Sequence, residues 1–109
     1  VIAALLALVM LLGMFSGCSN LTSLNLTDFD TSNVTGMSYM FSRCGSLTSL
    51  DLTGFDTSNV RNMKSMFSDC SSLVSLDLTS FDTANVVTAE YMFARCRNLT
   101  SVLLSLILV

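Results

Sequence analysis

Four cysteines are the residues of this 109-residue sequence with the clearest potential for chemistry. Thiols form disulfides, bind zinc or act as nucleophiles, and each use depends on spacing and partners. The cysteines recur every 26 residues, at Cys18, Cys44, Cys70 and Cys96. Because the short ligand spacings of zinc sites are missing, we predict a column of buried free thiols that act as small apolar groups. Disulfides between Cys18 and Cys44 and between Cys70 and Cys96 are the geometric alternative.

Aspartate and asparagine columns are the second candidate for chemistry, because oxygen-rich turns on successive repeats can bind calcium. The columns comprise Asp30, Asp56 and Asp82, and Asn33, Asn59 and Asn85. Too few carboxylates converge per turn for calcium, so we expect these side chains to bond backbone groups in turns. The sequence contains no histidine, which excludes Ser-His, Cys-His and histidine–metal mechanisms within this chain. We therefore predict a protein that is not an enzyme and uses no metal and no cofactor.

Charge restricts the partners that the chain can bind. Eight acidic and five basic residues give a formal net charge of −3, and only 12% of residues are charged. The few cations are scattered along the sequence, which argues against a nucleic-acid surface. Several charged residues fall near the Met-Phe-x-x-Cys segments and are expected to increase solubility, namely Arg43, Lys64, Asp69, Arg95 and Arg97.

A repeat of 26 residues must position all of these side chains. Met-Phe pairs begin at Met14, Met40, Met66 and Met92, so the units span 14–39, 40–65, 66–91 and, in part, 92–101. Within the second unit, Leu50 and Leu52 alternate with Asp51, which predicts a short strand over Leu47–Leu52 with one buried face. Phe55 follows this strand and is expected in the core.

The return segment of each unit has a different pattern. Apolar residues at spacings of three, four and seven (Val60, Met63, Met66 and Phe67) predict a helical turn or two, with an irregular return as the alternative. One unit alone cannot bury both its leucine row and its Met-Phe face, whereas stacked units can. The predicted fold class is α/β: a solenoid with a short parallel sheet on one side and helical or irregular returns on the other.

The repeated phrase M-F-x-x-C-x-x-L-x-x-L-D-L-[ST]-x-F-D-T-[SA]-N-V resembles the repeat of BspA-like bacterial surface proteins. Its leucine rows resemble leucine-rich repeats, and the resemblance extends from Met14 to Thr100. It implies a leucine-rich-repeat fold, a location at the cell surface or outside the cell, and a role in adhesion or protein binding. A purely structural spacer within a longer surface array is the alternative function.

Both ends depart from the repeat. Residues 1–13 begin with an unbroken apolar run, Val1–Leu12, which fits a truncated signal-peptide segment or a helical cap over the first unit. The residues that follow resemble a lipoprotein cleavage box, so Cys18 is a lipidation candidate, and a lipid anchor or signal is the predicted route to a membrane. Residues 102–109 are apolar apart from Ser105, which predicts a terminal strand or a truncated end capable of end-to-end self-association.

The outward face of the predicted sheet is the candidate binding surface, because the resemblance implies that partners dock there. Its residues are Ser23, Asn25, Thr27, Ser49, Asp51, Thr53, Ser75, Asp77 and Thr79. This face has no aromatic or arginine anchor of the kind that dominates binding hot spots. The predicted partner is a protein or a host-surface macromolecule.

Overall fold

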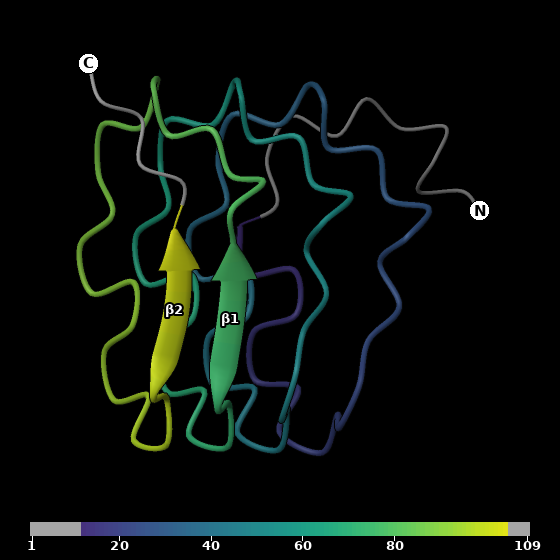
Figure 1. Ribbon diagram of the computed structural model, residues 1–109, viewed down its shortest axis with the longest axis vertical. Helices are drawn as coiled ribbons and strands as arrows, with labels where there is room; N and C mark the ends of the chain where they lie inside the picture. Colours follow the sequence, from purple (N-terminus) through teal and green to yellow (C-terminus); the bar gives the residue numbers. More distant parts are fainter. Residues whose placement is uncertain (1–11, 105–109) are drawn as a thin grey trace.

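The computed structural model describes residues 12–104. It contains strand β1 (Ser75–Leu78) and strand β2 (Ser101–Leu104), which pair in parallel with Ser75 opposite Ser101 and Leu78 opposite Leu104. Paired residues are therefore one repeat unit apart. Isolated parallel bridges join Gly36 to Asn62 and Asn62 to Thr88 with the same offset. Figure 1 shows the successive units lying side by side, with β1 and β2 on neighbouring units.

Backbone hydrogen bonds also connect the return segments of neighbouring units. Around the junction of the first and second units, Tyr39 N–H donates to the Lys64 carbonyl at 2.9 Å, and Arg43 N–H donates to the Ser68 carbonyl at 2.8 Å. The same positions one unit later, Ser65 and Asp69, donate to the carbonyls of Glu90 and Ala94 at 2.8 Å each. Each return therefore directs alternate N–H groups at the unit that follows it.

The helical form of the return segment is wrong, and the irregular alternative is what the structure has. No helix occurs within residues 12–104: residues 60–63 are irregular apart from the bridge at Asn62, and residues 64–69 form turns. An α-helix bonds its N–H groups to its own carbonyls, whereas Phe67 N–H here bonds the Met92 carbonyl at 3.0 Å. The predicted apolar face is nevertheless buried, since Val60, Met63, Met66 and Phe67 are all inaccessible to solvent or nearly so. Within the same described range, no helical segment has the length and apolar character needed to cross a membrane.

The core consists of columns of equivalent residues from successive units. The rings of Phe15, Phe41, Phe67 and Phe93 stack with centroid separations of 5.6, 5.7 and 5.8 Å and are nearly parallel. Leu50, Leu52 and Phe55 are buried and Asp51 is exposed, which confirms the predicted face alternation. The strand predicted over Leu47–Leu52 does not form, because ladder pairing is present only between the next two units, as β1 and β2.

Polar side chains join the turns of neighbouring units. The buried Thr57 hydroxyl donates to the Asp82 carbonyl at 3.0 Å and accepts a hydrogen bond from the Asp82 N–H at 2.8 Å. Asn59 Nδ2 donates to the Ser32 carbonyl at 2.8 Å, and Asp56 Oδ1 accepts from the backbone and hydroxyl of Ser58. The prediction that aspartate and asparagine bond turn backbones is thus confirmed.

The predicted terminal segments fall largely outside the described residues. Of residues 1–13, only Leu12 and Gly13 are described, so neither the signal segment nor the cap can be located. Of residues 102–109, Val102, Leu103 and Leu104 belong to β2, and the remainder lies outside the described range. Leu103 and Leu104 are more than half exposed.

Candidate functional site

The nine residues of the predicted sheet face are exposed, although only Ser75 and Asp77 lie in a strand, and their polar groups are largely engaged with one another. In each of three units, a carboxylate or amide oxygen accepts hydrogen bonds from both the backbone N–H and the hydroxyl of a threonine two residues later. The pairs are Asn25 with Thr27, Asp51 with Thr53, and Asp77 with Thr79, with distances of 2.6 to 3.1 Å. These bonds lower the pKa of Asp51 and of Asp77, because they stabilise the ionised carboxylates.

A shallow hollow of about 280 Å³ lies on this face. The structure brings four of the predicted residues together around it, namely Ser49, Asp51, Thr53 and Asp77. The other five, Ser23, Asn25, Thr27, Ser75 and Thr79, do not line it. Leu50 and Leu52 also line the hollow, and no aromatic or cationic side chain does, so it offers a partner hydroxyls, hydrogen-bonded carboxylates and a little aliphatic surface.

The cysteine column is built as a row of thiols, all of which are free in the structure. Cys70 Sγ donates to the Phe41 carbonyl at 3.1 Å, and Cys44 and Cys96 make the equivalent bonds to Phe15 and Phe67. Burial, followed by the neighbouring thiols, raises the pKa of Cys70 to about 12. Such a thiol is not a nucleophile at neutral pH. The lipidation candidate Cys18 is half-buried against the core in the same column, and its modification stays a prediction.

The aspartate and asparagine columns offer no preformed metal site in the described residues, where no group of three or more potential acidic or thiol ligands converges. Asp30 and Asp56 each direct Oδ1 at the serine two residues later, at 2.6 Å to the hydroxyl. These bonds lower the pKa of both carboxyls. The columns therefore stabilise turns.

Another hollow lies on the return side, where two positions of each repeat have left-handed backbone. Positive φ angles between 55° and 64° occur at six non-glycine residues: Tyr39, Arg43, Ser65, Asp69, Tyr91 and Arg95. Glycine occupies the two equivalent positions one repeat earlier, Gly13 and Gly17. This conformation is unfavourable for residues with a Cβ. The repeat backbone therefore imposes it at two columns, and large polar side chains project from both.

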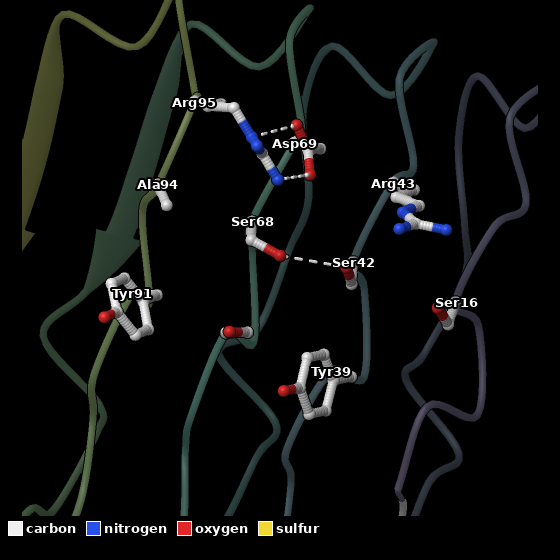
Figure 2. Close-up of a pocket in the computed structure, with 10 residues that line it drawn as sticks. Ser16, Tyr39, Ser42, Arg43, Ser68, Asp69, Tyr91, Ala94 and Arg95 are labelled. Carbon is white, nitrogen blue, oxygen red and sulfur yellow. Dashed lines mark hydrogen bonds and ion pairs between the residues drawn. The ribbon is translucent and has the colours of Figure 1, made fainter.

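A groove with a volume of about 550 Å³ lies between these two columns. Tyr39 and Tyr91 stand along one side of it, two units apart, and are 43% and 65% exposed. Figure 2 shows the two rings with their hydroxyls directed the same way and the serines between the columns. Ser42 and Ser68, both buried, share a hydrogen bond of 2.9 Å. The groove thus has tyrosine rings along one side and serine hydroxyls along its base.

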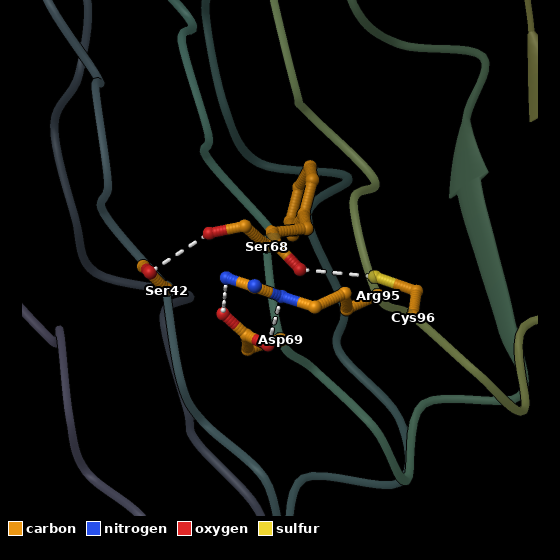
Figure 3. Close-up of polar contacts among 6 residues, drawn as sticks. Ser42, Ser68, Asp69, Arg95 and Cys96 are labelled. Atoms are coloured by element: carbon orange, nitrogen blue, oxygen red, sulfur yellow. Dashed lines mark hydrogen bonds and ion pairs between the residues drawn. The ribbon is translucent and has the colours of Figure 1, made fainter.

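Charged side chains form the opposite side of this groove. Arg95 binds Asp69 through two contacts, Nε to Oδ1 at 2.8 Å and Nη2 to Oδ2 at 2.9 Å (Figure 3). Arg43 makes no ion pair in the described part of the chain, and its guanidinium is directed away from Asp69 in Figure 2. A second cavity of about 450 Å³ shares Arg43, Asp69 and Arg95 and adds Arg97. We call the combined feature, lined by Tyr39, Arg43, Asp69, Tyr91, Arg95 and Arg97, the tyrosine–arginine groove.

Sequence reasoning missed this groove and assigned its charged residues to solubility. One feature of the sequence could have revealed it: the two tyrosines of the chain occupy the same repeat position, directly before a Met-Phe pair. Arg43 and Arg95 likewise share a position. What the pattern did not reveal is that both positions have left-handed backbone, which projects their side chains beside one hollow.

The structure therefore defines a repeat protein in which each 26-residue unit packs on the next and one side carries a polar, aromatic groove. The chain belongs to the family described as "Mycoplasma protein of unknown function, DUF285", whose match covers residues 9–105. No curated protein and no solved structure matches the sequence.

Proposed function

We propose that the chain is a non-catalytic recognition module of a BspA-like surface protein, exposed at the cell surface or secreted. In this proposal the stacked units are coils of a leucine-rich-repeat-type solenoid. The parallel pairing of β1 with β2 and the stacked phenylalanine column support that fold. The family match is compatible with a surface repeat protein.

The observation that carries recognition is the tyrosine–arginine groove. Tyrosine and arginine are the side chains enriched at binding hot spots, and tyrosine provides a large contact area with little conformational entropy to lose. Tyr39, Tyr91 and Arg43 are exposed and are not part of the core, so packing of the fold does not explain their presence. The predicted sheet face, in contrast, has polar groups already bonded within their own turns. We therefore place the principal contact surface on the return side.

The test is saturable binding of the labelled full chain to immobilised extracellular-matrix and host-cell-surface proteins. The double variant Tyr39→Ser/Tyr91→Ser removes the groove rings, and Asp51→Lys/Asp77→Lys changes the sheet face by the same number of residues. Recognition through the groove predicts that saturable binding is lost in the first variant and kept in the second. Loss in the second alone would move the site to the sheet face. Absence of saturable binding by the unmodified chain would favour the structural spacer.

A further inference from the structure

We propose that the tyrosine–arginine groove binds an extended acidic segment of a partner protein, with Arg43 taking a carboxylate of that segment. This inference rests on the proposed recognition function and gives it a ligand chemistry. It follows from the charge of the groove, the unpaired state of Arg43 and the spacing of its side chains.

Charge is the first argument. The chain as a whole is acidic, with a net charge of −3. Yet three of its five cations, Arg43, Arg95 and Arg97, line the groove, against the single carboxylate of Asp69. The groove is thus a cationic area on an acidic molecule. Such an area attracts anionic groups, while the remaining surface repels them.

The division of labour between the arginines is the second argument. Arg95 is held by Asp69 through a two-point contact and so neutralises that carboxylate. Arg43 occupies the equivalent position two units earlier, is exposed, and has no ion-pair partner among residues 12–104. A guanidinium matches a carboxylate in a planar, two-point geometry. Arg43 can make with a ligand the contact that Arg95 already makes with Asp69.

Spacing is the third argument. Tyr39 and Tyr91 are two units apart, and so are Arg43 and Arg95, which at the usual strand separation is roughly 10 Å. A peptide in the extended polyproline II conformation advances roughly 3.1 Å per residue with three residues per turn, so side chains three residues apart lie on one face at nearly this distance. A peptide crossing the units can therefore place one side chain at Tyr39 and another at Tyr91, with a carboxylate at Arg43.

A sulfated glycan is the competing anionic ligand, and the groove suits it less well. A polyanion of that kind needs several unpaired cations in a row, whereas Asp69 stands between Arg43 and Arg95 and neutralises one of them. The combination of tyrosine, serine and arginine is typical of surfaces that bind proteins. We therefore assign the groove to a peptide.

The experiment uses the intrinsic emission of the full chain, because both of its tyrosines line the groove and it contains no tryptophan. The probe is an acetylated nine-residue peptide of three Glu-Gly-Ser repeats, whose carboxylates recur every third residue. The matched control peptide has glutamine in place of glutamate. We expect a saturable change in emission with the acidic peptide and binding at least about tenfold weaker with the glutamine peptide.

Two matched variants locate the carboxylate contact. Arg43→Gln should weaken acidic-peptide binding about tenfold, whereas Arg61→Gln, which removes an exposed cation outside the groove, should leave it unchanged. Far-UV circular dichroism establishes that both variants are folded. Equal binding of the two peptides, no binding of either, or full binding by Arg43→Gln would overturn the proposal.

A heparin-derived hexasaccharide is the last arm of the experiment. If it changes the tyrosine emission saturably while the acidic peptide does not, the ligand is a sulfated glycan and the peptide assignment is wrong. Surface binding by the unmodified chain together with failure of the acidic peptide would overturn this inference alone. Absence of any surface binding would overturn the proposed function itself.

Discussion

Replacing Phe67 by alanine tests whether stacking between units is what holds the protein together. Phe67 is fully buried, and its ring stacks on Phe41 at 5.7 Å and on Phe93 at 5.8 Å. Truncation of a buried phenylalanine to alanine costs about 3–5 kcal/mol. Because two aromatic pairs, each worth about 0.5–1.5 kcal/mol beyond area burial, are also lost, we expect a loss in the upper part of that range.

Phe93→Ala is the matched control, since it makes the same chemical change at the last ring of the described column. Phe93 is partly exposed and stacks on one ring only. Its truncation should cost at least about 1 kcal/mol less than that of Phe67, because one aromatic pair and part of the burial are absent. A domain of this size is stable by about 5–15 kcal/mol, so Phe67→Ala removes a large share of the total.

The measurement is urea unfolding followed by far-UV circular dichroism, with the free energies of unfolding compared at equal slope. Stacking predicts that Phe67→Ala shifts the midpoint clearly further than Phe93→Ala. Equal shifts, or a loss below about 1 kcal/mol for Phe67→Ala, would refute the reasoning, because the ring column would then contribute no inter-unit stability.

Three further predictions concern polar and ionisable groups. Thr57→Val should destabilise the fold by about 1–3 kcal/mol, because it removes both hydrogen bonds to Asp82. The control is Thr83→Val at an exposed threonine, which should cost almost nothing, and similar urea midpoints for the two variants would contradict the prediction. The fold raises the pKa of Cys70 from 9.0 to about 12 and so holds this thiol protonated. The free energy of unfolding should therefore fall as pH rises from about 9 towards 12. Cys70→Ala should reduce the slope of this pH dependence, and an unchanged slope would contradict the prediction. The Thr53 hydrogen bonds lower the pKa of Asp51, so they stabilise the fold above about pH 4 and lose this effect as the carboxylate protonates below it. Asp51→Asn should make the melting temperature depend less on pH between pH 6 and pH 2. An equal pH dependence in both proteins would show that these bonds contribute nothing.

The buried positions could be predicted from the sequence because burial leaves a periodic trace. Leu50 and Leu52 alternate with Asp51, and the structure buries the leucines and exposes the aspartate. The turn-forming roles of Asp56 and Asn59 were predictable for a similar reason, because their short side chains bond nearby backbone groups.

The backbone of the returns could not be predicted in the same way. Apolar residues at Val60, Met63 and Phe67 have the spacing of a helix face, and they are buried as a helix face would be. The spacing does not show which carbonyls accept the backbone N–H groups, and in this protein Met63 and Phe67 donate to carbonyls of the unit that follows. A local pattern cannot distinguish these two arrangements, since the deciding partner lies about 25 residues away.

The groove was harder to predict than the core, because the backbone conformation that brings its side chains together leaves no periodic pattern of residue types. Most core columns carry the same or a similar apolar residue in successive units because each side chain packs against its counterpart, as the phenylalanine column does. Each of the two left-handed columns carries three residue types over four positions: Gly13, Tyr39, Ser65 and Tyr91 in one, and Gly17, Arg43, Asp69 and Arg95 in the other. Apart from the buried Ser65, the non-glycine side chains of these columns are exposed or partly exposed, so core packing does not select them. In a repeat protein of this kind, the surface that distinguishes partners is expected where the units differ, and its side chains can be exchanged while the buried columns hold the fold.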